Sequence, residues 1–556
     1  MKGGLQIAQE AVLRPIAEVA AEAGILEDEL EPYGRYRAKV SLSILERLAN
    51  TPDGKLIITT AITPTKAGEG KTTTSISLTQ GLGRLGRRVM LCLREPSMGP
   101  VFGIKGGGTG GGYAQIVPME DVNLHFNGDF HAVTAAHNLL AAALDASLFH
   151  GNPLGIDAAT ITWPRTLDVN DRELRYSVVG LGGKLHGVPR ENQFVITAAS
   201  EVMAVLALAS DLRDLRERLG RIVVAETRDG DPVTAEELNV AGAMTVVMKD
   251  AIKPNHVQTL EGQPTLVHAG PFGNVAHANN SVIEDRIALK LADYVVTEAG
   301  FAADLGFQKF CDIVCRVGGF APSAGVLVTT VRATKSHSGM AFEELGTPDL
   351  GALESGIANL SAHIGIVRRY GLPCVVAINR FPSDGDSELE LLEKLARDAG
   401  AENVVESDGF SRGGEGAVDL ANAVVDACGQ PNTFARLTPD GTSIREQVEA
   451  IAGQLYGAAG VDYLPQAEKD IVRMQALGMG EAPVCMAKTH LSLSHDPTLL
   501  GRPTGFRLPV RGVVPSAGAG FVVALCGDMQ RMPGFGRKPN FVGVDVDDEG
   551  RTIGLF

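Results

Sequence analysis

Short runs of aliphatic and β-branched residues alternate along this chain with longer stretches whose apolar residues recur at helical spacing. This alternation is typical of βαβ units, in which successive strands join one parallel sheet. A helical stretch at residues 75–85 directly follows the first run and its glycine loop. The pattern predicts an α/β fold with parallel strands at residues 56–62, 89–93, 221–225, 294–297, 324–330, 373–378 and 403–406.

The two ends of the chain show different patterns. Residues 1–24 place Glu10, Glu18 and Glu22 among apolar residues, which predicts an amphipathic helix and not a secretory signal. From Val510 onward, apolar and polar residues alternate, so we expect antiparallel strands and turns that close an α/β domain. No apolar run approaches the roughly 20 residues that span a bilayer.

Size and charge narrow the possible functions. With 556 residues the chain is too long for one core, and about three to four domains are expected. The balance of 50 Lys and Arg against 66 Asp and Glu gives a net charge of −16. That sign disfavours broad binding to nucleic acid or to an anionic membrane. Seven cysteines, mostly within apolar runs, predict reduced thiols in a cytoplasmic protein.

The first strand leads into a loop with the sequence TPTKAGEGKTTT, residues 63–74. Glycines at 68 and 70 can turn backbone N–H groups toward a triphosphate, Lys71 can reach its β and γ phosphates, and Thr72 can bind Mg²⁺. Thr65 stands where the usual phosphate-loop pattern has glycine, and an incidental G-K-T triplet is the alternative. The strand before the loop and the helix after it favour an ATP site in a P-loop NTPase-like core.

Two further segments follow the strand at residues 89–93. Arg94 should project from the strand end into the same cleft, where a guanidinium can bind a carboxylate or acyl phosphate. A structural ion pair with Glu95 or a neighbouring acid is the alternative. Seven of the ten residues from Gly103 to Gly112 are glycine, which indicates either a loop that wraps an anion or a hinge.

Several aromatic, histidine and acidic residues are weaker candidates. Phe301, Phe381 and Phe410 lie in polar, turn-rich segments after strands, where aromatic rings suit stacking on a flat heterocycle or simply plug a loop. Three histidines at spacings of six match no zinc pattern, so we expect core roles for them. Asp129 nearby is either a cation ligand or a loop cap. These candidates are His125, His131 and His137.

Taken together, these motifs resemble the formate–tetrahydrofolate ligase family from end to end. The resemblance rests on EPYGRYRAKV, TPTKAGEGKTTT, LREPSMGPVFGIKGG, GGGYAQIVPMEDVNLHFNGDFHA, QTLEGQPTLVHAGPFGNVAHANNS, LADYVVTEAGFAADLG, VVAINRFPSD, CMAKTHLSLSHDP, LLGRPTGF and SAGAGFVVAL. It implies that formate attacks MgATP to give formyl phosphate and ADP. Tetrahydrofolate then takes the formyl group to give 10-formyltetrahydrofolate and phosphate.

The resemblance also implies roles for particular residues. Lys71 would neutralise charge on the transferring phosphoryl group, and Arg94 would orient formate and then formyl phosphate. Glu95 and Asp129 would hold a monovalent cation, potassium or ammonium. The folate rings would stack on Phe301, Phe381 and Phe410. The ATP phosphates would be held by Thr65, Lys66, Ala67, Gly68, Glu69, Gly70, Lys71 and Thr72, the last with Mg²⁺.

The family further implies a cytoplasmic, stand-alone homotetramer, and we expect three α/β domains. Residues 1–110 with 305–368 would form the nucleotide-binding domain. Residues 111–304 would complete the ATP and formyl phosphate cleft, and residues 369–556 would contribute to the folate site.

Two residues depart from the family pattern. Phe410 stands where tryptophan is common, and Lys66 stands where proline is common. The second departure gives KAGEGKT, which is close to the loop of ParA/MinD-like ATPase switches, proteins that act through dimers on DNA or membrane. Chain length, net charge and the full-length resemblance disfavour that alternative. An inactive family member is disfavoured because Lys71, Thr72 and Arg94 are all present.

Overall fold

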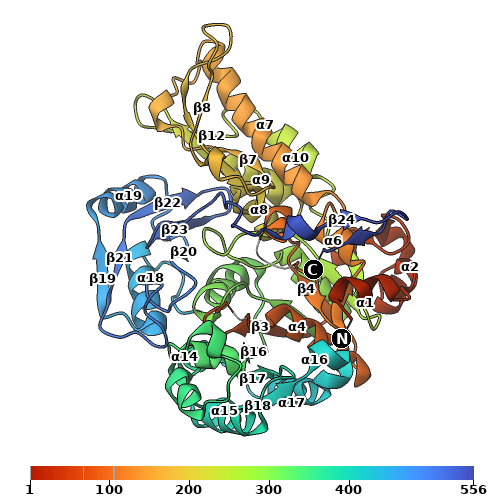
Figure 1. Ribbon diagram of the computed structural model, residues 1–556. Helices are drawn as coiled ribbons and strands as arrows, with labels where there is room; N and C mark the ends of the chain where they lie inside the picture. Colours follow the sequence, from red (N-terminus) through yellow and green to blue (C-terminus); the bar gives the residue numbers. More distant parts are fainter. Residues whose placement is uncertain (1, 67, 104–106, 556) are drawn as a thin grey trace.

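A computed structural model describes residues 2–66, 68–103 and 107–555, and one large mixed sheet dominates it (Figure 1). Within these residues the sheet has 12 strands, ten of them in the order β1-β2-β13-β14-β4-β15-β3-β16-β17-β18. Its parallel part consists of β14 (Pro264–Val267), β4 (Val89–Leu93), β15 (Tyr294–Glu298), β3 (Lys55–Ala61), β16 (Ala324–Thr329), β17 (Cys374–Asn379) and β18 (Asn403–Ser407).

The parallel strands are buried on both faces, as their unbroken apolar runs require. In β3 every residue after Lys55 is buried, and β4, β16 and β17 are buried throughout. Helices cover the sheet and pack against these strands. They are α4 (Lys71–Arg84), α11 (Val282–Leu291), α14 (Leu350–Arg369), α15 (Asp386–Asp398) and α17 (Val418–Cys428).

The sheet is mixed and not purely parallel, which corrects the sequence expectation. Its antiparallel edge is built from β13 (Asn255–Thr259), β2 (Ala38–Val40) and β1 (Leu30–Pro32). The pair β5 (Gly110–Gly111) and β6 (Ala114–Val117) joins the same edge through β13. Strands of this one sheet come from all three predicted domains, whose limits stay a prediction.

An arm formed by residues 129–248 extends away from the sheet (Figure 1). Its helices are α7 (Asp129–Phe149), α8 (Glu201–Leu208), α9 (Leu212–Arg221) and α10 (Ala241–Met248), and its strands are β7 (Arg165–Leu167), β8 (Ser177–Val179), β9 (Arg190–Asn192), β10 (Phe194–Ile196), β11 (Val223–Glu226) and β12 (Pro232–Thr234). The predicted strand at residues 221–225 corresponds to β11. It pairs antiparallel with β12 and lies outside the large sheet, so its predicted place was wrong.

The C-terminal part forms a smaller α/β unit beside the arm (Figure 1). It contains α18 (Ile444–Ile451), β19 (Gly460–Tyr463), α19 (Pro465–Ala476), β20 (Val484–Ala487), β21 (Arg507–Val510), β22 (Gly512–Ser516) and β23 (Phe521–Leu525), followed by β24 (Asp545–Val546) and β25 (Thr552–Ile553). The predicted antiparallel pairing of the tail is confirmed for β22 with β23 and for β24 with β25.

The N-terminal segment is two helices and not one. They are α1 (Gly4–Glu10) and α2 (Ile16–Ala23), and the break falls at residues 11–15. Pro15 precedes α2 with extended backbone, and a proline cannot continue a helix that needs its N–H.

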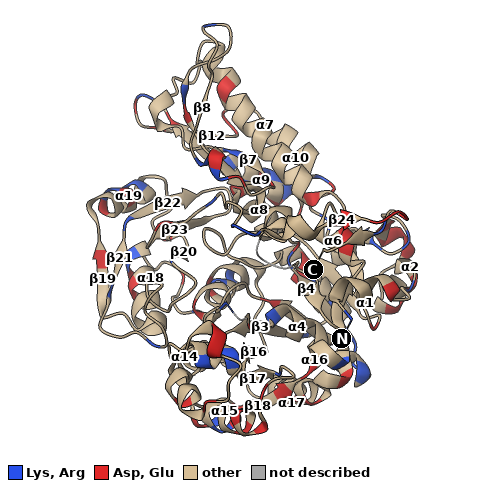
Figure 2. Cartoon of the chain, viewed as in Figure 1, with Lys and Arg blue, Asp and Glu red and all other residues tan. Residues whose placement is uncertain are grey.

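One helix among the described residues, α7, is long and apolar enough to span a bilayer. It packs against α10, α8 and β7, and core helices pass the same test, so this is weak evidence for a membrane span. Figure 2 shows acidic and basic residues interspersed along the outer elements in this view.

Candidate active site

The loop between β3 and α4 is held in a turn that needs glycine. Gly68 and Gly70 have φ of 73° and 75°, and Gly70 immediately precedes α4. Glu69 fixes the start of the loop because its carboxylate accepts hydrogen bonds from the Thr65 amide and hydroxyl, at 2.7 and 3.0 Å. Lys66 is exposed, and Ala67 lies outside the described residues. The N-terminus of α4 therefore carries the loop as an anion site requires.

Buried polar side chains hold Thr63, the first residue of the loop segment, in place. His363 and Asn359 contact its hydroxyl at 3.0 and 2.9 Å, and His337 contacts its carbonyl oxygen at 2.9 Å. Burial lowers the pKa of His363 to about 4, so this ring is neutral in the folded protein at neutral pH. Sequence reasoning missed this network, since its members come from two distant helical segments.

Gly70 has a second constraint besides its positive φ. A Cβ there would lie 2.1 Å from Nδ2 of Asn379, the last residue of β17, which donates to the Glu69 carbonyl at 3.3 Å.

We therefore expect Gly70→Ala to weaken ATP binding at least tenfold, measured with a fluorescent ATP analogue. Gly86→Ala is the matched control. Its φ is 70° but its Cβ would meet nothing within 4 Å, so only the backbone cost of about 1–2 kcal/mol applies. Equal ATP affinities of the two variants would contradict the steric argument.

Two cations and a carboxylate meet at the carboxyl edge of β4, β15 and β3. Strand register brings them together, since Cys92 of β4 pairs with Thr297 of β15. Arg94 follows β4, Glu298 ends β15, and a guanidinium nitrogen lies 3.9 Å from the carboxylate. Lys71 Nζ donates to the Phe301 carbonyl at 3.0 Å. Of the expected structural ion pairs of Arg94, the one with a neighbouring acid is present, with Glu298, and the one with Glu95 is not found among the described contacts.

The charges of this cluster, formed by Lys71, Arg94 and Glu298, suit the binding of an anion. Burial lowers the pKa of Lys71, and the neighbouring Arg94 lowers it further while Glu298 opposes this. Burial also lowers the pKa of Arg94, and again Glu298 opposes the shift. A bound phosphate or carboxylate would stabilise the cationic form of both side chains. Glu298 has one oxygen, Oε2, that is buried without a hydrogen-bond partner within the described structure.

Glu95 and Asp129 lie together, although they are 34 positions apart in sequence. Asp129 is already bound on both oxygens, by Lys39 Nζ at 2.6 Å and by Asn255 Nδ2 at 2.7 Å. Glu95 Oε2 is buried with no partner in the described residues. Burial and the nearby Asp129 raise the pKa of Glu95 well above its ordinary value. No group of three or more His, Cys, Asp or Glu side chains that could hold a metal occurs within the described part of the chain.

The three candidate phenylalanines follow three strands of the sheet. Phe301 follows β15 with φ 57°, and its ring stacks on His490 with centroids 4.7 Å apart. Phe381 follows β17 under the Arg332 guanidinium at 5.1 Å. Phe410, in α16 (Gly409–Arg412) after β18, is 42% exposed. No aromatic contact between described residues joins any two of these rings.

Of the remaining sequence candidates, His125 and His131 are exposed, so a core role is wrong for these two. His137 contacts Ser200 at 2.8 Å and stacks on Trp163, as expected for a core histidine. All seven cysteines are buried free thiols. Of the glycine-rich segment, Gly108 donates to Asn123 at 2.9 Å and Gly112 packs against Phe410, while residues 104–106 lie outside the described part.

Comparison with known proteins finds similarity over nearly the whole chain. The family model described as formate–tetrahydrofolate ligase matches residues 2–556. Proteins with that name from Desulforamulus reducens and Roseiflexus sp. (strain RS-1) are each 55% identical, over 99% and 100% of both chains. One from Symbiobacterium thermophilum is 53% identical over the full length of both. The chain therefore belongs to the formate–tetrahydrofolate ligase family.

Proposed function

We propose that this protein joins formate to tetrahydrofolate at the expense of ATP, giving 10-formyltetrahydrofolate, ADP and phosphate. The observation that carries this proposal is the convergence of Lys71 and Arg94 beside a glycine loop at the carboxyl edge of the sheet. Two cations there can bind a triphosphate and a carboxylate side by side. Full-length similarity to relatives of that name supports the same activity.

The proposed first step is phosphoryl transfer in a P-loop NTPase-like core. A formate oxygen attacks the γ-phosphorus, the bond to the β-phosphate oxygen breaks, and ADP leaves. Lys71 lies where charge grows on the transferring phosphoryl group, and Arg94 holds the formate carboxylate in line. Glu298 keeps both cations in place before substrates bind. In the second step N10 of tetrahydrofolate attacks the formyl carbon, phosphate leaves, and the nitrogen loses its proton.

Two metal or ammonium cations would assist this reaction, and the residues at the two proposed cation sites fit them to different degrees. Mg²⁺, which shields phosphate charge when bound, would be held by Thr72, the second residue of α4. The unpartnered Glu95 Oε2 beside Asp129 fits a monovalent cation, potassium or ammonium. Lys39 already supplies a positive charge to Asp129, so Glu95 is the acid of this pair that still lacks a cationic partner.

The decisive test is an assay of the purified protein with MgATP, formate, tetrahydrofolate and potassium. ADP release and the absorbance of the acid-formed methenyl derivative should both require formate and folate, and omission of potassium should lower turnover. ADP release that is indifferent to formate and folate would instead support a ParA/MinD-like ATPase switch.

We further propose that Phe301, Phe381 and Phe410 form the folate platform. Phe410→Trp should tighten tetrahydrofolate binding about threefold to tenfold, because a larger ring adds about 0.5–1.5 kcal/mol of stacking. Calorimetric titration measures this affinity. Phe342→Trp, at an exposed position away from these strand ends, is the control. Unchanged affinity in Phe410→Trp would remove this residue from the platform.

The family relationship also underlies three structural proposals. We infer a cytoplasmic enzyme that works as a homotetramer, and a division into residues 1–110 with 305–368, 111–304 and 369–556. Size-exclusion chromatography with light scattering tests the oligomeric state directly.

A further inference from the structure

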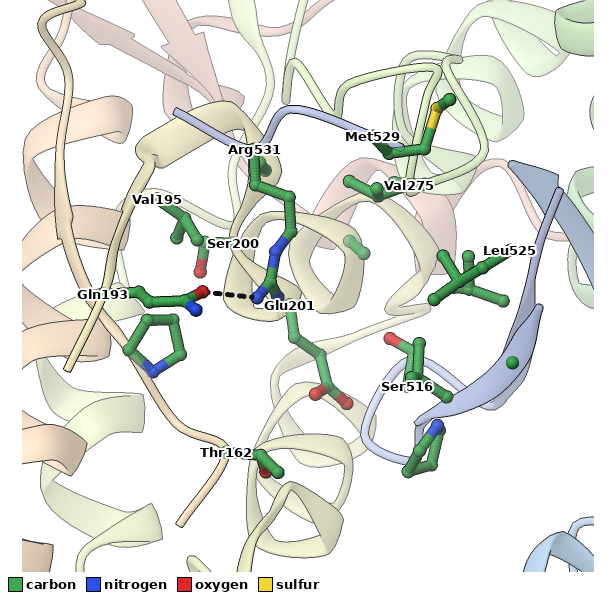
Figure 3. A pocket seen from close by; sticks show the side chains of 18 of the residues that line it. Thr162, Gln193, Val195, Ser200, Glu201, Val275, Ser516, Leu525, Met529 and Arg531 are labelled. Carbon is green, nitrogen blue, oxygen red and sulfur yellow. Dashed lines mark hydrogen bonds between the residues drawn. The ribbon is translucent and has the colours of Figure 1, made fainter. Parts of the chain in front are cut away.

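A separate cavity of about 700 Å³ lies between the arm and the C-terminal unit (Figure 3). It is lined by the start of α8, by residues next to β10 and by β22, β23 and residues 527–531. None of the residues assigned above to ATP, formate, folate or cations is among the described residues that line it. The cavity therefore needs an explanation of its own.

Arg531 gives this cavity a positive charge without a carboxylate partner. Figure 3 shows its side chain extending into the cavity, where it donates to Gln193 Oε1 at 3.3 Å. Arg531 is exposed to solvent, and no carboxylate of the described chain lies within ion-pair distance of its guanidinium. Two other lining arginines are already paired, Arg511 with Asp528 and Arg473 with Glu226.

Glu201 brings a carboxyl group into the same cavity, and this group offsets the charge of Arg531 only in part. Its carboxylate points into the cavity and accepts a hydrogen bond from the Gly518 amide at 2.7 Å (Figure 3). Burial raises the pKa of Glu201 to about 7, so near neutral pH part of the population carries no charge there. Asp470 and Asp528 also line the cavity, which disfavours a ligand with more than one negative charge.

The rest of the wall is largely apolar. It includes Val195, Val275, Leu525 and Met529, together with Trp163, whose ring is stacked on His137 at 4.2 Å. A concave apolar site with few convergent polar groups is the usual form of a small-molecule site. We propose that this cavity binds a small monocarboxylate with an apolar or aromatic body, its carboxylate on Arg531. This site goes beyond the proposed ligation, and its test does not depend on that activity.

The chain offers an internal reporter for this site, because Trp163 is its only tryptophan. The probe is 4-tert-butylbenzoate, titrated into the full-length protein by calorimetry and by tryptophan fluorescence. We expect saturable binding with a change in Trp163 emission, and at least tenfold weaker binding of the neutral 4-tert-butylbenzamide. Equal affinity for the two compounds would overturn the proposal, and tighter binding of 4-tert-butylphenyl phosphate would overturn the monocarboxylate class.

Substitutions test whether Arg531 is the group that binds the carboxylate in this cavity. Arg531→Gln should weaken 4-tert-butylbenzoate binding at least tenfold and leave the amide unaffected. Arg511→Gln, in the same cavity but already paired with Asp528, should leave the affinity within about twofold. Glu201→Gln should tighten the benzoate, which keeps the proposal testable if the Arg531 variant does not fold. Benzoate binding that is unchanged in Arg531→Gln, or weakened in Glu201→Gln, would contradict the assignment.

Discussion

Replacing Lys71 by alanine is expected to lower turnover at saturating ATP by about 10²–10³-fold, the usual cost of removing one preorganised charge-stabilising donor. The ammonium lies at the start of α4, held on the Phe301 carbonyl and close to Glu298 and Glu69. No other side chain of the described loop provides a cation at that point, since Lys66 is exposed. Formation of ADP and of the methenyl derivative should fall together, because both follow phosphoryl transfer.

Lys66→Ala is the matched control for this experiment. It removes the same charge from the same loop, but from a position that the structure leaves at the surface. We expect less than a threefold change in turnover. A loss in Lys66→Ala as large as in Lys71→Ala would mean that the loop works as in ParA/MinD-like proteins, where a second lysine contacts the phosphates.

The central strands could be predicted from sequence because burial on both faces makes their apolar runs unbroken. The predicted run at residues 89–93 coincides with β4, the run at 294–297 ends one residue before β15 does, and the run at 373–378 is shifted by one residue from β17. The run at residues 221–225 has the same local character, yet it pairs in the arm. Local pattern predicts that a segment is a strand, whereas its partner depends on contacts that no short window contains.

Strand-end reasoning also predicted that the glycine loop and Arg94 lie at the same edge of the sheet, because parallel strands bring their carboxyl ends to one edge. It could not find Glu298 as the partner of Arg94, since that pairing depends on the register of β15 against β4. Asn379 was missed for a similar reason. Its role appears only when its amide is seen against the Glu69 carbonyl.

The proposed cation ligands, Glu95 and Asp129, show more clearly which contacts a sequence motif cannot reveal. The family resemblance placed Glu95 and Asp129 in one site, but gave no sign that Lys39, 90 positions before Asp129, already neutralises it. His490 against Phe301 is a second example, because it comes from the C-terminal unit. Both contacts join segments that are distant in sequence, and neither has a local pattern.

Arg94→Ala is expected to damage formate use more than ATP use. A charge-assisted hydrogen bond contributes about 1.5–3 kcal/mol, so kcat/KM for formate should fall by about 10- to 150-fold. The KM for ATP should change by less than threefold, since the loop and Lys71 remain. Steady-state kinetics with each substrate varied in turn separates the two effects. Arg84→Ala, which removes an exposed arginine of α4 paired with Glu261, should change neither value.

Glu298 makes a second variant necessary, because Arg94→Ala leaves its buried carboxylate without its ion-pair partner and with only Lys71 as a nearby cation. The double variant Arg94→Ala with Glu298→Gln removes that orphaned charge. If Arg94 acts on formate, the double variant should still show the selective loss in kcat/KM for formate. If the double variant restores formate use, the damage came from the unpaired carboxylate and Arg94 has no direct role in holding formate. Formate dependence that is intact in Arg94→Ala itself would lead to the same conclusion without the second variant.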